Sequence, residues 1–261
     1  MLAEELTNQV YYFVLILARV LGFLVVAPIF GSKSLPNRLK IGLAVFITII
    51  ILPITSFSAI KAPEGLLIIS FQLIIELFIG FIIGFIMLLN FMALQLAGQF
   101  IDTRIGFAMA SVIDPQNGMQ APLVGQFKNI LATLLFLVIN GHHYLLKALT
   151  DSFTIVGVTK FHGSSELVWA LFRIVGDLFP LGFRLALPVI AILFIVDVAF
   201  GLVARVVPQI NVFMMGMPTK VLVGIIFLII ILPSYINTLQ DLFNGTTNDI
   251  YKILKLMIER G

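Results

Sequence analysis

Four charged side chains inside long apolar stretches, Arg19, Glu76, Arg184 and Asp197, most constrain what this 261-residue chain can do. A charge at a lipid-exposed helix centre costs about 2.5–3.5 kcal/mol on insertion scales. We therefore expect these side chains to face one another, partner subunits or water. Together they indicate either a polar pathway or a buried pairing network. For any single one, an ion pair that only fixes helix register is the simpler interpretation.

The other groups that could do chemistry are few. His142 and His143 follow Asn140-Gly141, but adjacent histidines cannot share a helical face. We interpret them as a polar helix end and not as a metal site. Asp197 has no second aspartate in a matching apolar run, which argues against an intramembrane aspartyl protease. The sequence has no cysteine, nucleophile elbow, phosphate loop or zinc-protease motif. It therefore predicts no enzyme activity, catalytic residue, cofactor or metal.

The composition indicates what surrounds the chain. Hydrophobic residues make up 60% of it and charged residues 11%, whereas soluble domains carry roughly 25% charged residues. Most of the chain should therefore contact lipid or other apolar protein. The net charge of +3 is too small to indicate nucleic-acid binding.

The apolar residues cluster in long runs. Most approach or exceed the roughly 20 residues that cross a bilayer core, and backbone groups in lipid must pair internally, which favours helices. The sequence predicts an all-α membrane-associated fold with about six long apolar helices in helical hairpins. The runs are Val10–Phe30, Ile41–Ile60, Leu66–Ile101, Phe127–Leu149, Leu178–Ala204 and Val221–Phe243.

The third run is too long for a simple span. As a helix, Leu66–Ile101 would extend about 54 Å, against a hydrocarbon core of about 30 Å. Gly80 and Gly84 form a small-xxx-small face suited to close helix packing. Asp102 and Arg104 bracket the end of the run, where they could pair locally or cap that end.

An apolar segment with helix breakers, residues 106–122, follows this run. Irregular backbone at membrane depth persists only when it is buried in protein or lines a cavity, and methionine fills irregular gaps. The segment could seal a pore, or it could be a surface loop that touches lipid headgroups. The candidate sealing residues are Gly106, Phe107, Met109, Val112, Ile113, Asp114, Pro115 and Met119.

Two further features bear on how the chain meets its surroundings. Basic residues are divided evenly between the two sides that six spans would create, whereas an ordinary inner-membrane protein shows a bias. Residues 244–261 form an amphipathic tail with apolar residues at helical spacing, such as Ile250 and Leu254. We expect this tail to lie at an interface or on a partner.

The chain resembles the FliR family, the R components of the type III secretion export gate, over nearly its whole length. The most specific motif is Arg205-x-x-Pro208-Gln209-x-Asn211-Val212-Phe213, followed by Gly216-x-Pro218-x-Lys220. The other motifs are Arg19 with Pro28 and Pro36, Glu76 with Gly80 and Gly84, Ala97-Gly98 and Gly106 before Asp114-Pro115, and Asn140-Gly141-His142-His143.

The resemblance implies an architecture. Residues 1–162 would form a half similar to the P component, including a pore plug at 106–122. Residues 163–243 would form a hairpin similar to the Q component, and 244–261 the tail. The chain would join FliP and FliQ in a helically staggered assembly, drawn largely out of the bilayer plane, which would account for the even charge distribution.

The resemblance also implies a function and site residues. The assembly would conduct unfolded flagellar subunits across the bacterial inner membrane, at the flagellar basal body, with FlhB and FlhA as further partners besides lipid. Charged residues for burial or assembly would be Arg19, Glu76, Asp102, Arg104, Arg184, Asp197 and Arg205. A loop on the cytoplasmic side, near FlhB, would carry Pro208, Gln209, Asn211, Phe213, Gly216, Pro218 and Lys220.

Two other functions compete with this one. A secondary transporter, or a channel subunit for small solutes, is motivated by the intramembrane charges and a weak internal repeat. The short chain and the poor repeat argue against it. An intramembrane enzyme is motivated only by the two histidines and Asp197.

Overall fold

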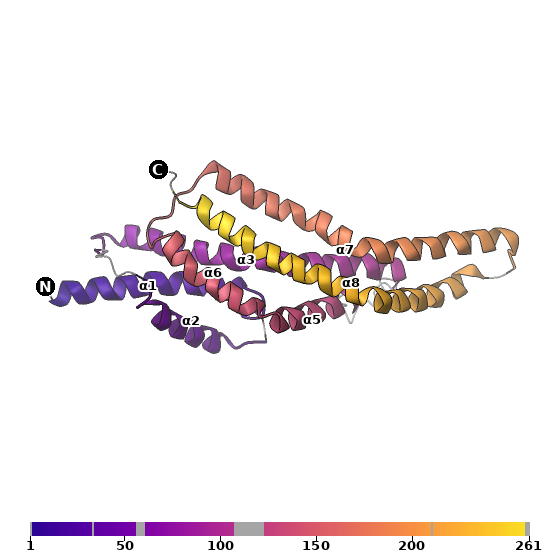
Figure 1. Cartoon of the computed structure of the whole chain (residues 1–261), viewed down its shortest axis with the longest axis horizontal. Coiled ribbons are helices and arrows are strands. Elements are labelled where there is room, and N and C mark those ends of the chain that lie inside the picture. Colours follow the sequence, from indigo (N-terminus) through magenta and orange to yellow (C-terminus); the bar gives the residue numbers. More distant parts are fainter. Residues whose placement is uncertain (1, 33, 56–60, 107–122, 210, 259–261) are drawn as a thin grey trace. The chain divides into compact units, whose positions relative to one another are not determined.

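The computed structural model describes residues 2–32, 34–55, 61–106, 123–209 and 211–258. Within these ranges the regular structure is helical and no strand occurs, which confirms the all-α fold class. The helices, shown in Figure 1, are α1 (Leu2–Val26), α2 (Asn37–Ile51), α3 (Leu66–Ile105), α5 (Leu123–Val138), α6 (Gly141–Ile155), α7 (Ser165–Val206) and α8 (Val212–Leu256).

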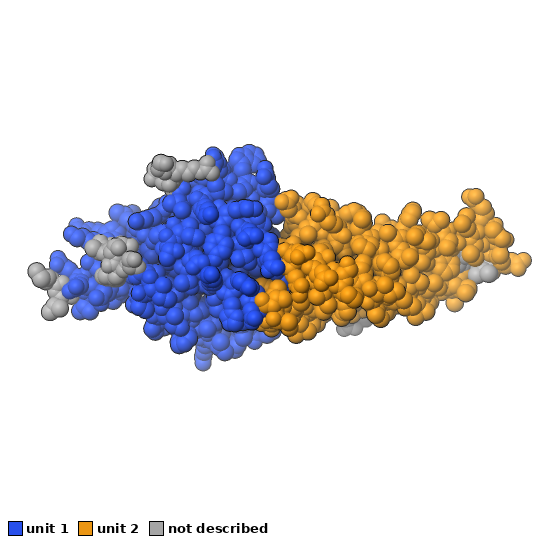
Figure 2. Space-filling view, in the orientation of Figure 1, with its two compact units in different colours: residues 1–89, 140–175, 243–261 blue, residues 90–139, 176–242 orange. Residues whose placement is uncertain are grey.

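The chain folds into two compact units, coloured separately in Figure 2. Unit 1 comprises residues 1–89, 140–175 and 243–261, and unit 2 comprises residues 90–139 and 176–242. The helices α3, α7 and α8 therefore contribute residues to both units. The division at residues 162 and 243 implied by the family resemblance stays a prediction.

The number of long apolar helices is smaller than expected. Among the described residues, four helices are long and apolar enough to cross a membrane. The pair α5 and α6, bent by 68° at a short break, would make a fifth if it counts as one span. The expected six spans therefore become four or five.

Two local features explain the difference. The helix α2 has 15 residues, or about 22 Å at 1.5 Å per residue. It ends shortly before Pro53, which cannot donate to a helical hydrogen bond. The run Phe127–Leu149 is broken at Asn140, whose backbone is left-handed at φ 58° and ψ 29°. An L residue interrupts a right-handed helix in that conformation, and asparagine tolerates it better than most.

In unit 1, α1 and α3 pack backbone to backbone through glycines. A Cβ atom on Gly80 would overlap the Arg19 carbonyl oxygen. A Cβ on Gly84 would lie 2.9 Å from the Phe23 oxygen and from the Ala27 nitrogen. The predicted close packing at Gly80 and Gly84 is therefore confirmed, and it brings the charged residues of the two helices into reach of each other.

The C-terminal part of α8 packs within unit 1. Ile250, Ile253 and Leu254 are buried, whereas Lys252 and Lys255 are exposed. The His162 amide donates to the Met257 carbonyl at 2.8 Å, which ties the connector before α7 to this end of α8. The segment is amphipathic as expected, but its apolar face is covered by the chain itself and not by a partner.

In unit 2, α3 meets α5 and α7 at small residues. A Cβ on Gly98 would overlap the Gly125 backbone, and one on Gly182 would lie 3.1 Å from the Ala93 oxygen. The helices α7 and α8 form the hairpin seen in Figure 1. Phe100 of α3 packs edge-on against Phe179 and Phe183 of α7.

The connection between α7 and α8 is shorter than the sequence suggested. It comprises residues 207–211, of which 210 is outside the described part. Gly216, Pro218 and Lys220, expected in a loop, lie in the first turns of α8. Pro218 is the seventh residue of α8 and lies inside the helix, as Pro233 does, so proline does not mark the loop here.

Candidate functional site

The most buried charged group of unit 1 is an ion pair between α1 and α3. Arg19 and Glu76 have relative side-chain exposures of 0% and 1%. The Arg19 Nε and Nη2 each lie 2.7 Å from Glu76 Oε2, an arrangement in which both guanidinium edge nitrogens face one carboxylate oxygen. An ion pair that is buried away from water is stable only when its remaining polar atoms also make hydrogen bonds.

Unit 1 supplies most of those partners from α6 and the segment after it. The Arg19 Nη1 donates to the carbonyl oxygens of Ser152 and Val156, both at 2.9 Å. The guanidinium carbon lies 4.3 Å from the centre of the Phe153 ring. The Thr159 amide donates to Glu76 Oε1 at 2.9 Å. The pair thus joins α1, α3 and α6, and these two charges are compensated within the chain.

A second buried carboxylate connects α3 to α5 in unit 2. Asp102 is 4% exposed, and its carboxylate accepts hydrogen bonds from the amides of Val124 (3.1 Å) and Gly125 (3.4 Å). These amides belong to the first turn of α5, where helical amides lack intrahelical acceptors and favour a negative charge. Asp102 therefore caps α5 from another helix, and its predicted capping role applies to α5 and not to its own helix.

A polar cavity of about 410 Å³ lies in unit 2, between the end of α3 and the α7–α8 hairpin. An ion pair between Asp197 of α7 and Lys220 of α8, both partly exposed, lines it. Residues expected in three separate groups meet here: the start of the sealing segment, the intramembrane charges and the loop between α7 and α8. They are Arg104, Gly106, Asp197, Gly216 and Lys220, and the other lining residues are Thr103, Ile105, Phe200, Gly201, Ala204 and Met217.

The remaining predicted residues are not brought together. Arg184 and Arg205 lie on exposed faces of α7, and neither makes a salt bridge within the described part of the chain. Pro208, Gln209 and Asn211 are exposed between α7 and α8. Phe213 belongs to α8 by its backbone. Phe107, Met109, Val112, Ile113, Asp114, Pro115 and Met119 lie outside the described residues.

Sequence reasoning missed Lys128, which lies near the start of the apolar run Phe127–Leu149 and was not singled out. Lys128 lies in α5 and is 3% exposed. Its ammonium nitrogen lies 4.5 Å from the centre of the Tyr235 ring. Val124, Lys128, Ala132 and Phe136 are all buried and recur every four residues, which places them on one helical face. That spacing was a signal that Lys128 points inward.

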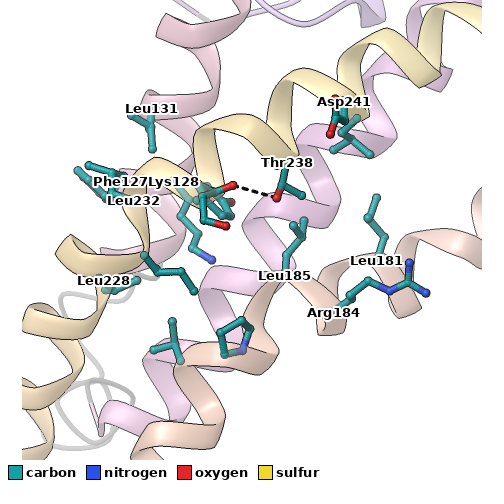
Figure 3. A pocket seen from close by; sticks show the side chains of 16 residues that line it. Phe127, Lys128, Leu131, Leu181, Arg184, Leu185, Leu228, Leu232, Thr238 and Asp241 are labelled. Atoms are coloured by element: carbon teal, nitrogen blue, oxygen red, sulfur yellow. Dashed lines mark hydrogen bonds between the residues drawn. The ribbon is translucent and has the colours of Figure 1, made fainter.

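Lys128 and Tyr235 line a second cavity of unit 2, of about 420 Å³, shown in Figure 3. Its walls come from α5, α7 and α8 and are mostly aliphatic. Within the described residues, no three histidine, aspartate or glutamate side chains are placed to hold a metal ion. The buried charges of the described residues are therefore suited to helix packing, to helix capping and to contacts with other charged groups.

Long helices with exposed apolar faces, together with charges paired deep between helices, define a multi-pass membrane protein. Comparison with known proteins identifies the family to which this membrane protein belongs. Residues 10–246 match the model of the family described as bacterial export proteins, family 1. Flagellar biosynthetic protein FliR of Bacillus subtilis is 36% identical over 251 residues, covering 94% of this chain and 95% of the relative.

Other relatives agree. FliR of Pectobacterium carotovorum is 35% identical, covering 96% of this chain and 95% of the relative. FliR of Escherichia coli is 32% identical, covering 91% and 90%. The chain belongs to the FliR family of bacterial export proteins. It is a multi-pass inner-membrane subunit of the flagellar export apparatus.

Proposed function

We propose that the chain is a non-enzymatic core subunit of the flagellar type III export gate. In this proposal it forms, with FliP and FliQ, the channel through which unfolded flagellar subunits cross the inner membrane. FlhB and FlhA are neighbouring components. The family membership supports the export role, and the exposed surface of unit 2 supports the assembly with partner subunits.

The observation that carries the proposal is the extent of apolar surface on the α7–α8 hairpin. Within unit 2, each helix contributes about 46 Å of length, against an apolar bilayer core of about 30 Å. Large hydrophobic side chains remain exposed over this length, among them Phe179, Phe194, Leu202, Leu222 and Ile229. If these helices crossed a bilayer upright, its apolar core would cover only part of their exposed apolar surface. Partner helices are therefore expected to cover the rest.

Arg184 fits the same proposal. It lies in the middle of α7 between hydrophobic residues and is exposed. Within the described residues it pairs with no carboxylate. An unpaired cation at membrane depth is unfavourable, so we assign Arg184 to contact with a partner subunit or with water inside the assembly.

The proposed gating elements rest on the family resemblance. We propose that residues 106–122 form the plug that seals the channel, and that residues 208–220 face the cytoplasm near FlhB. The two segments would then lie close together at one end of each, because Gly106, Gly216 and Lys220 all line the polar cavity.

The test is site-specific photo-crosslinking in cells that make the whole export apparatus. A photoreactive amino acid at Phe194 or Leu222, each 62% exposed, should cross-link to FliP or FliQ. The same amino acid at Leu193, which is fully buried beside Phe194, is the matched control and should not. Absence of cross-links from both exposed positions, with export still functioning, would contradict the proposal.

A further inference from the structure

The aliphatic cavity of unit 2 combines apolar walls with polar groups that lack partners. Its walls include Leu181, Leu185, Leu228, Ile231 and Leu232. Ligand pockets commonly measure about 300–1,000 Å³ and are mostly apolar with a few polar groups, and the cavity, at about 420 Å³, is within this range.

Lys128 is the charged group inside this cavity. Figure 3 shows its side chain reaching between the helices toward the cavity. Its ammonium group makes no salt bridge or hydrogen bond within the described part of the chain. Its neighbours there are the Tyr235 ring and, beyond contact distance, the Asp102 carboxylate, which attracts the ammonium group but does not accept a hydrogen bond from it. A buried ammonium group without an acceptor is strongly unfavourable, so an acceptor from outside the chain would be bound readily.

Tyr235 supplies an independent second group. It is 8% exposed, and its hydroxyl is buried without a hydrogen-bond partner among the described residues. Buried hydroxyl groups are normally satisfied. The Lys128 ammonium and the Tyr235 hydroxyl, both donors without a hydrogen-bond acceptor, thus belong to neighbouring side chains that line the same cavity.

We propose that this cavity binds an anionic amphiphile. Its acidic headgroup accepts hydrogen bonds from the Lys128 ammonium and the Tyr235 hydroxyl, and its hydrocarbon chain lies against the aliphatic walls. The headgroup chemistry is shared by the phosphate of an acidic phospholipid and the carboxylate of a fatty acid. The proposal concerns ligand binding by the folded chain and does not depend on the proposed channel.

The rim of the cavity fits a ligand that enters from the membrane. Phe127, Arg184, Ser234, Thr238 and Asp241 line it and are exposed. Figure 3 shows the Arg184 guanidinium on the side away from Lys128. Arg184 and Asp241 carry opposite charges, so the lining residues have a net positive charge from Lys128. The Asp102 carboxylate offsets part of this charge from outside the lining, but it accepts its hydrogen bonds from Val124 and Gly125. The preference for an acidic ligand therefore rests on the unmet donors of Lys128 and Tyr235.

The experiment measures ligand retention by the full chain in detergent. The protein is incubated with vesicles of phosphatidylglycerol, vesicles of phosphatidylcholine, or oleate, then washed, and the bound ligand is quantified by mass spectrometry. Retention of phosphatidylglycerol or of oleate well above phosphatidylcholine is expected, and the stronger of the two identifies the source. Equal retention of all three would overturn the proposal.

Two substitutions locate the site. Lys128→Met keeps the length of the side chain and should reduce retention of the acidic ligand about tenfold, as expected for a lost charge-assisted hydrogen bond. Tyr235→Phe keeps the ring and should reduce it about threefold. Lys147→Met is the control, because Lys147 is exposed on α6 and does not line the cavity. Equal retention by Lys128→Met and Lys147→Met would overturn the proposal.

A thermal measurement keeps the test decisive if a variant folds poorly. A ligand that binds only the folded state raises Tm. Phosphatidylglycerol or oleate should raise the Tm of the wild type and of Lys128→Arg, but not that of Leu185→Trp, which fills the cavity and keeps Lys128. A ligand-dependent rise of equal size in Leu185→Trp would contradict a ligand in this cavity.

Discussion

At the scale of single residues, the structure separates charges that the chain satisfies itself from charges that it leaves open. Arg19 and Glu76 form a fully buried pair with additional hydrogen bonds. Asp102 caps a neighbouring helix. Arg184 makes no salt bridge among the described residues, and Lys128 makes neither a salt bridge nor a hydrogen bond there, although the Asp102 charge lies near it. The first group maintains the fold, and in our proposals the second provides contacts for lipid or partner subunits.

The Arg19–Glu76 pair gives a first prediction. Arg19→Met leaves the Glu76 carboxylate buried without its counter-charge, and removal of one partner of a buried pair costs about 3–5 kcal/mol. We expect a loss of this size in the unfolding free energy, measured by denaturant titration in detergent. The double variant Arg19→Met, Glu76→Met should recover part of it.

An exposed pair on α8 is the matched control for this prediction. Lys252 and Asp249 lie 3.2 Å apart and are largely exposed. Lys252→Met should change the unfolding free energy by less than about 1 kcal/mol, because water screens such pairs. Equal losses from Arg19→Met and Lys252→Met would show that the buried pair does not hold unit 1 together.

Asp102 gives a second prediction. Asp102→Ala leaves the amides of Val124 and Gly125 without their acceptor and should cost about 1–3 kcal/mol. Hydrogen–deuterium exchange should then be faster in the first turn of α5. Asp102→Asn keeps an acceptor oxygen and should show a smaller increase. Unchanged exchange in Asp102→Ala would contradict the capping role.

At the scale of helices, close packing at glycine fixes which residues can meet. Gly80 allows α1 and α3 to approach so closely that a methyl group would overlap the Arg19 backbone. Gly98 does the same for α3 and α5 in unit 2. These contacts are selective, because other helical glycines, such as Gly176, have open space around them.

The contrast between these glycines gives a third prediction. Gly80→Ala must push α1 and α3 apart and should destabilise unit 1 by about 1–3 kcal/mol. Gly176→Ala meets no neighbouring atom and should stabilise α7 by up to about 1 kcal/mol, because alanine favours the helix. Thermal unfolding of the two variants should shift in opposite directions. A stabilising effect of Gly80→Ala would contradict the described packing.

The sequence predicted much at this scale. The apolar runs identified the fold class, and Gly80 and Gly84 identified a close helix contact. The run length did not predict that α2 ends at Ile51, although Pro53 was a signal. The partner of Arg19 could not be predicted, because Glu76 and Ser152 are 57 and 133 residues away along the chain and only tertiary packing brings them together. The burial of Lys128 was predictable from its spacing with Val124 and Ala132.

At the scale of the whole molecule, the chain is a FliR-family subunit whose unit 1 pairs its buried charges Arg19 and Glu76 with each other and whose unit 2 is rich in exposed apolar surface. Of the alternatives that the sequence left open for its buried charges, Arg19 and Glu76 take the first, because they face one another. Partner subunits are still needed in our account, because they would cover the apolar faces of the α7–α8 hairpin and the exposed Arg184.

The most direct test is purification of the chain with and without FliP and FliQ. With them, we predict a detergent-stable complex that elutes as one peak and contains all three proteins. Made alone in detergent, the chain should be recovered in low yield as a folded but polydisperse, self-associating population, since the α7–α8 hairpin would remain uncovered. A stable, monodisperse single subunit that does not co-purify with FliP and FliQ would contradict the account.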